Sequence, residues 1–296
     1  MPELPDIVVY IEALERRVLG RHVRGFRISS PSVLRTYDPP YDSVVGREVV
    51  GLRRIGKRIA WDLAGGLVLV VHLMVAGRLK WSDEKGVAVP KKVGLCAWDF
   101  DQGTLVLTEQ GTHKRAGVWV FPDAVSAAAE DRGGVEPLEV APDEFAAALT
   151  RENRTLKRAL TDPRIFSGIG NAFSDEILWE AGLSPVKRTS QLAEEEVVRL
   201  YDATRASLVR WTDLLRETVG EGWPDKVTAF RPEMAVHGKF GEPCPRCGSR
   251  VQRIVYASNE TNYCATCQTG GRLLADRSLS RLLKDDWPTT LEELEG

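Results

Sequence analysis

The sequence has no uninterrupted apolar run of about 18 residues, the length that a membrane-spanning helix requires. It also lacks a basic segment followed by an apolar stretch at its start, which is the pattern of a secretory signal peptide. These absences argue against a membrane protein and against an exported one. We therefore expect a cytoplasmic protein.

Cysteine and net charge are also scarce. The 296 residues include five cysteines, and four of them form two close pairs, unlike the scattered cysteines of a disulfide framework. The formal net charge is −2, so the chain lacks the overall positive charge of many nucleic-acid-binding proteins. Its basic residues nevertheless gather at 47–58, 151–164 and 239–253. Folding could bring these groups into one groove or leave them as three separate solvated faces.

Short alternating or apolar runs, broken by glycine and proline, fill residues 22–121. The hydrophobic content of 43% and charged content of 28% are typical of a soluble globular protein, and the length suggests two domains with a small third module. The short connections favour antiparallel pairing in a β-sandwich or flattened barrel. The strands are predicted at 23–28, 48–54, 58–63, 67–73, 95–100, 104–108 and 117–120.

Helical patterns stand on both sides of this β region. Asp6 is the expected N-cap of a helix over 7–19, and Gly20 is its expected stop. An acidic segment over 130–142 has the composition of a linker, and 220–235 has the composition of a mobile loop. Further helices are predicted at 145–149, 156–160, 172–181 and 192–215.

The first six residues, Met-Pro-Glu-Leu-Pro-Asp, contain a candidate active site. Removal of Met1 would leave a secondary amine at Pro2 beside the carboxylate of Glu3. An α-amino group titrates near roughly 7.7–8.0, so part of it is neutral and nucleophilic at physiological pH. The alternative is an inert, frayed terminus, as in most chains.

The strongest local motif is Cys244-Pro-Arg-Cys247 followed, after a β-like segment, by Cys264-Ala-Thr-Cys267. Two such pairs fit a tetrahedral four-thiolate zinc ribbon. Four thiolates leave no position for water, so we predict one structural zinc ion. Cys96 lies in an apolar strand and is expected to be a buried, inert thiol.

A second motif is Gly168-Ile-Gly170-Asn171, directly before a predicted helix. Glycines at a helix start leave backbone N–H groups for an anion, and Asn171 adds a side-chain donor. A plain turn is the alternative. Lys157 and Arg158 on the preceding helix favour a phosphate-binding variant of the helix–turn–helix.

In this order the motifs resemble the formamidopyrimidine-DNA glycosylase / endonuclease VIII family over about residues 2–268. They are MPELPD, Gly56-Lys57, His72-Leu73, the run from Gly168 to Glu176, and the run from His237 to Cys244 that leads into the cysteine pairs. The resemblance implies an α+β multidomain protein that binds damaged double-stranded DNA as a monomer, at the nucleoid. The expected divisions are a β-sandwich catalytic domain with a leading helix (1–130), a linker (131–142), a helix–two-turns–helix domain (143–235), a zinc-ribbon finger (236–268) and an extension (269–296) with a further helix over 273–283.

The resemblance also implies a mechanism. A damaged nucleotide leaves the duplex, Pro2 attacks C1′ to form an iminium, and elimination then cleaves the strand. Glu3 supplies and accepts protons, and Lys57 binds a flanking phosphate or protonates the departing base. Glu176 or Asp6 would support the site through hydrogen bonds. The residues expected to contact DNA are His72, for which a satisfied core histidine is the alternative, and Met74, Lys157, Asn171, Lys239 and Asn259.

Three departures from the family pattern stand out. Asn259 replaces an arginine of the ribbon hairpin, which puts a phosphate contact and the elimination step in doubt. His-Leu-Gly-Met becomes His72-Leu-Met74-Val75, so either Met74 or Val75 is the intercalating wedge. Residues 112–117 replace a loop that carries an aromatic side chain, so we expect a different lesion preference. The alternatives are a glycosylase with weak or absent strand incision and a non-catalytic DNA-damage-binding zinc protein.

Overall fold

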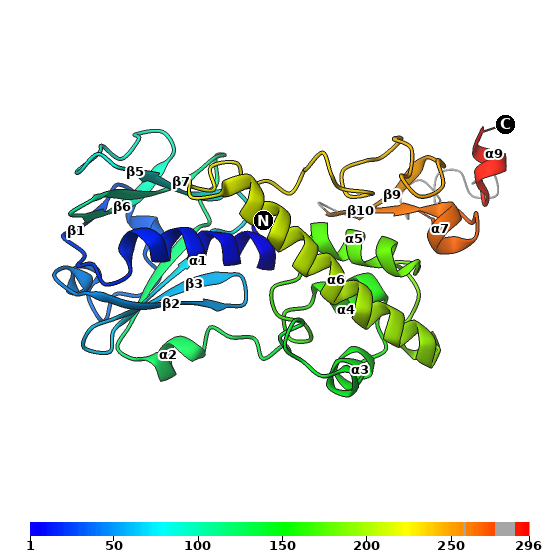
Figure 1. Ribbon diagram of the computed structural model, residues 1–296, viewed down its shortest axis with the longest axis horizontal. Helices are drawn as coiled ribbons and strands as arrows, with labels where there is room; N and C mark the ends of the chain where they lie inside the picture. Colours follow the sequence, from blue (N-terminus) through cyan, green and yellow to red (C-terminus); the bar gives the residue numbers. More distant parts are fainter. Residues whose placement is uncertain (257–258, 276–287, 296) are drawn as a thin grey trace. The chain divides into compact units, whose positions relative to one another are not determined.

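Eight strands within residues 1–121 form two four-stranded antiparallel sheets in the computed structural model (Figure 1), which describes residues 1–256, 259–275 and 288–295. One sheet has the order β1-β6-β7-β5 and the other β2-β3-β4-β8. Their bounds are β1 Gly25–Ile28, β2 Val49–Ile55, β3 Arg58–Leu63, β4 Val68–His72, β5 Gly77–Ser82, β6 Gly94–Phe100, β7 Gly103–Glu109 and β8 Gly117–Phe121. The predicted antiparallel sandwich is confirmed.

The sequence-based prediction missed β5. Leu79 in this strand is buried while its neighbours Arg78 and Lys80 are not, which is the alternation of a half-buried strand. The strand pairs with β7 over its whole length. Arg78 and Lys80 obscure this alternation in the sequence, and the burial of Leu79 reveals it.

The leading helix α1 spans Leu4–Val18 and begins three residues before the predicted start. The prediction of Asp6 as N-cap is wrong, because Glu3 is the N-cap and Asp6 is the third residue of the helix. Pro5 fits the first turn, where no intrahelical N–H bond is needed. The buried face of α1 contacts β2 and β3 through side chains that include Ile7, Tyr10, Leu14 and Val18.

The chain forms two compact units. Unit 1 comprises Met1–Arg132 and Trp211–Thr228, and unit 2 comprises Gly133–Arg210 and Ala229–Gly296. The domain boundaries expected from composition stay a prediction. Unit 1 contains the short helix α2 Ala124–Ala128 and the 3-10 helices η1 Pro31–Val33 and η2 Tyr41–Val44.

The first part of unit 2, Gly133–Arg210, is helical, and its second part contains the zinc hairpin. Gly182, at φ 65°, ends α5 in the left-handed conformation that glycine adopts without strain. The hairpin pairs β9 with β10 in antiparallel register. The elements are α3 Pro142–Thr150, α4 Leu156–Thr161, α5 Asn171–Ala181, η3 Thr189–Gln191, α6 Glu194–Val219, β9 Val251–Tyr256, β10 Asn259–Cys264, α7 Ala265–Thr269 and α9 Leu291–Glu295. Helix α6 belongs to unit 2 up to Arg210 and to unit 1 from Trp211 onward.

Residues 220–235 contain neither helix nor strand, as predicted, but the part within unit 1 is firmly packed. Trp223 Nε1 donates to Leu79 O at 2.9 Å, and the Trp223 ring contacts Tyr10 and Trp81. The predicted helix over 273–283 falls largely outside the described residues, and 273–275 are not helical. Leu273 packs beside Tyr263, so the extension touches the hairpin.

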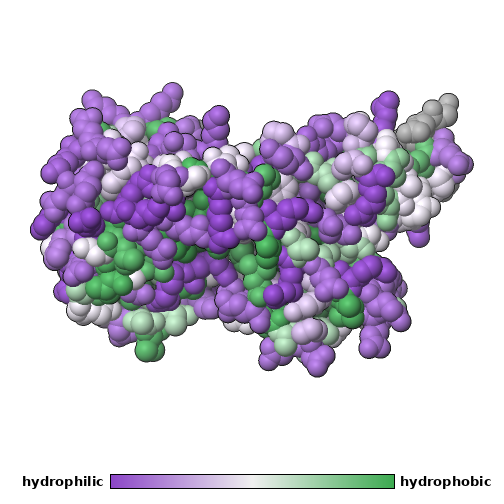
Figure 2. Space-filling model, in the orientation of Figure 1, coloured by the Kyte–Doolittle hydropathy of each residue, from purple (hydrophilic) through white to green (hydrophobic). Residues whose placement is uncertain are grey.

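Hydrophilic side chains cover most of the face seen in Figure 2, with hydrophobic areas between them. Scattered apolar side chains are normal on a protein surface. Within the described residues, no helix combines the length and the apolar character needed to cross a membrane.

Candidate active site and nucleic-acid interface

Pro2 and Glu3 are held in place by the start of α1. Both residues are buried, and Glu3 is 2% exposed. The Glu3 backbone N–H donates to Asp6 Oδ2 at 2.9 Å within a capping box. Because the helix begins directly after Glu3, the segment that carries the candidate nucleophile has a defined position.

Four charged side chains lie within electrostatic reach of the amino terminus. Burial lowers the pKa of the Met1 amino group below its ordinary value; the charges of Arg78 and Lys57 act in the same direction, whereas Glu3 and Asp6 oppose it. A lowered pKa leaves more of an amine neutral and nucleophilic near pH 7. The Pro2 nitrogen is one residue away, so an amine formed there would meet the same four charges.

Lys57 occupies the two-residue turn between β2 and β3. Gly56 precedes it with φ 60°, a conformation that glycine adopts readily. The Lys57 charge acts on both the Met1 amine and His72. The structure therefore brings Lys57, Glu3 and His72, which are far apart in the sequence, to one region of unit 1.

His72 ends β4 and is 9% exposed. Its Nδ1 accepts the Met74 N–H at 2.8 Å, so Nε2 carries the proton of the neutral ring. Burial, together with the charges of Arg58 and Lys57, lowers the pKa of His72 to about 3. At physiological pH, His72 is a neutral hydrogen-bond donor and not a cation.

This depressed pKa makes the free energy of unfolding depend on pH. His72 titrates near roughly 6.5 in the unfolded chain, so the fold loses stability as pH falls from about 6.5 towards 3. We expect the loss between pH 7 and pH 5 to be about 1–2 kcal/mol smaller in His72→Gln than in the wild type. Urea unfolding at each pH measures it, with the exposed His22→Gln as control. Equal losses in all three proteins would contradict the assignment.

Met74 and Val75 form the turn that follows His72. Met74 has φ 52°, the one positive φ among the non-glycine residues that the structure describes. Glycine fits this backbone best, which explains the Gly of the family pattern at this place. Val75 then stands where the pattern has methionine, and it is 63% exposed while Met74 is half-buried.

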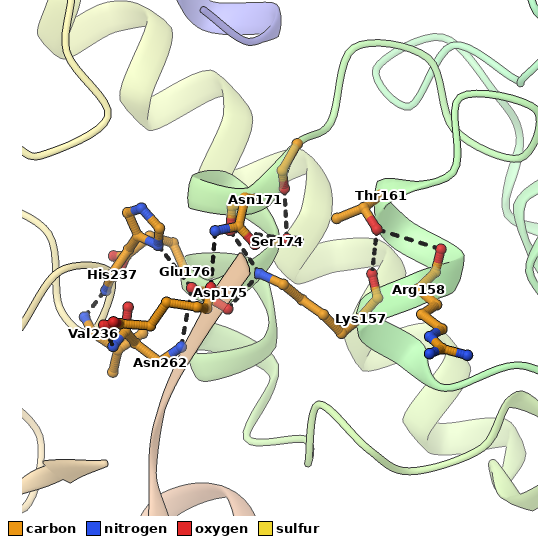
Figure 3. Close-up of polar contacts among 12 residues, drawn as sticks. Lys157, Arg158, Thr161, Asn171, Ser174, Asp175, Glu176, Val236, His237 and Asn262 are labelled. Carbon is orange, nitrogen blue, oxygen red and sulfur yellow. Dashed lines mark hydrogen bonds and ion pairs between the residues drawn. The ribbon is translucent and has the colours of Figure 1, made fainter. Parts of the chain in front are cut away.

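Asn171 is the first residue of α5 and joins this helix to the zinc hairpin. Its Nδ2 donates to Glu260 O of β10 at 2.9 Å, and its own carbonyl accepts from Lys157 Nζ at 2.6 Å (Figure 3). An amide nitrogen has two hydrogens. One of them is used within the protein. Contact of Asn171 with DNA stays a prediction.

Lys157, which is predicted to bind a phosphate, has a partner inside unit 2. Its contact with DNA stays a prediction. Its Nζ lies 2.5 Å from Asp175 Oδ1, and the side chain is only 12% exposed. A buried ammonium needs such a carboxylate, because an unpaired charge in a low-dielectric site is strongly unfavourable. We therefore assign Lys157 to the internal framework of unit 2.

Asp175 is the centre of that framework, as Figure 3 shows. Its side chain is fully buried, and its Oδ2 lies 2.7 Å from His237 Nδ1 and 3.2 Å from the Asn262 N–H, which donates to it. With Lys157, the carboxylate therefore connects α4, α5, the segment before the cysteine pairs, and β10. The Lys157 ammonium, the His237 ring and the Asn262 N–H are donors of the kinds that bind phosphates, and here they bind the Asp175 carboxylate.

Glu176 acts on the same segment. Its carboxylate accepts the backbone N–H groups of Ala235, Val236 and His237, each at 2.9 Å. Burial raises the pKa of Glu176, and the three N–H donors act against that rise. The residue fixes the backbone that leads into the zinc hairpin.

Asp175→Asn is expected to lower the free energy of unfolding by about 3–5 kcal/mol, because it leaves the Lys157 charge buried without its carboxylate. Urea unfolding measures the change. The double variant with Lys157→Met should recover part of the loss, since no unpaired charge remains. Additive losses in the double variant would show that the pair does not interact as described.

Lys239 and Asn259 lie on the zinc-hairpin region. Lys239 Nζ forms an ion pair of 3.0 Å with the exposed Glu242, and such pairs contribute little to stability. Asn259 is exposed at the first position of β10, opposite Tyr256. Contacts of Lys239 and Asn259 with DNA stay a prediction.

The four predicted zinc ligands converge at the base of the hairpin. Their sulfur atoms all lie within 4.8 Å of one another, with 3.4 Å between Cys247 and Cys264 and 3.9 Å between Cys244 and Cys267. Sulfurs around a tetrahedral zinc are about 3.8 Å apart when each bond is about 2.3 Å long. The donor set therefore fits one structural zinc ion. Cys96 is buried in β6, as predicted, and is not a member of this cluster.

Two residues of these sites escaped sequence reasoning. Arg78 stands in the strand that was missed, and Asp175 was read only as part of the run that ends at Glu176. The available signal for Asp175 was an acidic pair in a helix that also contains Ala172, Phe173, Ile177 and Leu178, since carboxylates on a buried helix face need internal partners.

Three family models match successive parts of the chain. They are described as the formamidopyrimidine-DNA glycosylase N-terminal domain (residues 1–115), the formamidopyrimidine-DNA glycosylase H2TH domain (134–217) and the zinc finger found in FPG and IleRS (241–270). Together they follow the order of the motifs in the sequence.

Individual relatives of the chain carry the same family name. An uncharacterized formamidopyrimidine-DNA glycosylase-like protein of Mycobacterium tuberculosis is 39% identical over 51% of this chain and 94% of its own length. The formamidopyrimidine-DNA glycosylase of Carboxydothermus hydrogenoformans is 32% identical over 90% of this chain and 100% of its own. A crystal structure of Lactococcus lactis Fpg with DNA containing N7-benzyl-Fapy-dG has a TM-score of 0.80 at 25% identity, covering 90% of this chain and 100% of that one. The resemblance predicted from the motifs is confirmed: the chain belongs to the formamidopyrimidine-DNA glycosylase family.

Proposed function

We propose that this protein is a base-excision-repair DNA glycosylase with AP lyase activity that acts on damaged double-stranded DNA. The buried Pro2–Glu3 segment carries the proposal, because removal of Met1 would set an amine beside a carboxylate there, and the Lys57 charge already acts on the amino terminus one residue away. We further propose that the protein acts as a monomer in the cytoplasm, at the nucleoid when it is bound to DNA.

The proposed reaction uses Pro2 as nucleophile after Met1 is removed. The damaged nucleotide leaves the stack, because its C1′ cannot be reached inside the duplex. The Pro2 nitrogen forms a bond to C1′, and the base departs with the electrons of its glycosidic bond and takes up a proton. Lys57 is the proposed donor of that proton or a ligand of the flanking phosphate.

Glu3 then protonates the sugar ring oxygen as the C1′–O4′ bond opens, and an iminium forms between C1′ and the Pro2 nitrogen. The positive iminium acidifies C2′–H. Loss of this proton expels the 3′ phosphate and cleaves the strand.

The proposed DNA contacts come from both units, each taken by itself. His72 offers a neutral N–H to a phosphate oxygen, and Asn171 offers its second amide hydrogen. For the wedge we propose Val75 in preference to Met74, since Val75 is the more exposed. The zinc ion would hold the hairpin that presents Asn259.

Asn259 supports a second candidate, a glycosylase with weak or absent strand incision. An amide cannot grip a phosphate bidentately as a guanidinium does. A strand whose phosphate is poorly held would undergo elimination more slowly than base release.

End-labelled duplexes with an abasic site, 8-oxoguanine or an oxidised pyrimidine distinguish the readings. Strand breaks without alkali would support the glycosylase with lyase activity. Breaks that appear only after alkali would support weak incision. Binding of the damaged duplexes with neither product would overturn both and leave a non-catalytic DNA-damage-binding protein.

A further inference from the structure

The Arg78 guanidinium donates to three backbone carbonyls of unit 1. Its Nε lies 2.7 Å from Val227 O, and its Nη1 lies 3.1 Å from Val75 O and 2.6 Å from Gly77 O. Val227 and Val75 are 152 positions apart in the sequence. One side chain at the start of β5 therefore links two loops that no strand or helix joins.

Apart from Gly77, neither linked segment lies in a helix or strand. The turn after β4 contains the unfavourable backbone of Met74 and the exposed Val75. The segment 223–228 has no helix or strand, and Trp223 anchors its start on Leu79 O. Arg78 binds Val227 near the end of that segment. Its neighbour in β5, Leu79, accepts the hydrogen bond from Trp223 at the start of the segment.

Arg78 is also close to the amino terminus. The charges that act there come from α1 (Glu3 and Asp6), from the β2–β3 turn (Lys57) and from β5 (Arg78). The two cationic groups disfavour a protonated amine, and the two carboxylates favour it. The Arg78 side chain therefore links the two loops and also places a positive charge near the proposed nucleophile.

We propose that Arg78 is a positioning residue for the proposed reaction: by bridging the turn 73–77 and the segment 223–228 beside the amino terminus, it holds both loops in the arrangement in which a flipped nucleotide is presented to Pro2. This inference rests on the proposed glycosylase function. The proposed role uses the Nε and Nη1 donors, which are both bound to the protein backbone, and requires no contact of Arg78 with substrate.

Two substitutions separate the linkage from the charge. Arg78→Lys keeps the positive charge but loses the forked donor that reaches several carbonyls at once. Arg78→Gln loses both. The exposed Arg24, which pairs with Asp101 on the β-sandwich, provides the matched control Arg24→Gln.

The first measurement is amide hydrogen exchange on the full-length zinc-bound protein, which reports local opening without any substrate. We expect faster exchange at 73–77 and 223–228 in both Arg78 variants and no change there in Arg24→Gln. Exchange at both segments equal to that of the control would overturn the proposal.

The second measurement is single-turnover base excision together with borohydride trapping as a function of pH. Loop misplacement should slow excision about 10–100-fold in both Arg78 variants. Only Arg78→Gln should move the midpoint of trapping to higher pH, because removing a nearby positive charge raises the amine pKa. An unchanged excision rate in both variants would overturn the positioning role.

Failure of the proposed function gives a different result. In that case the wild type itself releases no base and forms no cross-link, while the exchange experiment still decides whether Arg78 ties the two loops together.

Discussion

A chain extended by one alanine before Pro2 should lose borohydride cross-linking to abasic-site DNA by about 1,000-fold or more. The extension moves the free amine away from the buried Pro2–Glu3 segment and turns the Pro2 nitrogen into an amide. An amide nitrogen has no available electron pair for attack on C1′, whereas a neutral amine does. Gel electrophoresis of the trapped complex measures the loss.

Pro2→Gly and Glu3→Gln refine this result. Pro2→Gly keeps a terminal amine, so we expect a partial loss of about 10–100-fold, consistent with a misplaced nucleophile. Glu3→Gln should lose base excision by about 100-fold or more, because it removes proton transfer to the ring oxygen. Undiminished cross-linking by the alanine-extended chain would show that Pro2 is not the nucleophile.

Cys264→Ser should reduce bound zinc well below one ion per chain and weaken binding to abasic-site DNA at least about 100-fold. Cys264 ends β10 and caps α7, so it joins the hairpin to the metal. Structural zinc contributes apparent binding energies of about 10–16 kcal/mol in small zinc domains, far more than a two-stranded hairpin gains alone.

Zinc content by atomic emission and DNA affinity by fluorescence anisotropy measure these effects. Cys96→Ala is the matched control, because it removes a buried thiol outside the cluster and should leave the zinc content unchanged. A Cys264→Ser protein with one zinc per chain and full DNA affinity would contradict the structural role of the ion.

Short-range patterns explain most of what could be predicted. The cysteine pairs, the Pro-Glu start and the Gly-Ile-Gly-Asn turn each place their chemistry within a few residues. Strands such as Arg58–Leu63 were predicted with the bounds that the structure has, because alternation and flanking glycines are local. The start of α1 was predicted three residues late, since Asp6 and Glu3 are both good N-terminal residues and the capping box uses both.

Long-range partners could not be read from the chain. The basic neighbours of Lys157 in the sequence favour a phosphate ligand, and they give no sign of Asp175, eighteen positions away, which binds its ammonium. The same limit applies to Arg78, whose acceptor Val227 is 149 positions away.

The sequence by itself determined the family, the four-thiolate metal site and the position of the candidate nucleophile, because each depends on residue types at short, fixed spacing. Only the tertiary structure decided which charged side chains face outward and which are used inside. A buried charge takes the nearest partner that the packed chain provides. That partner comes from whichever element folding brings alongside, as Asp175 is for Lys157.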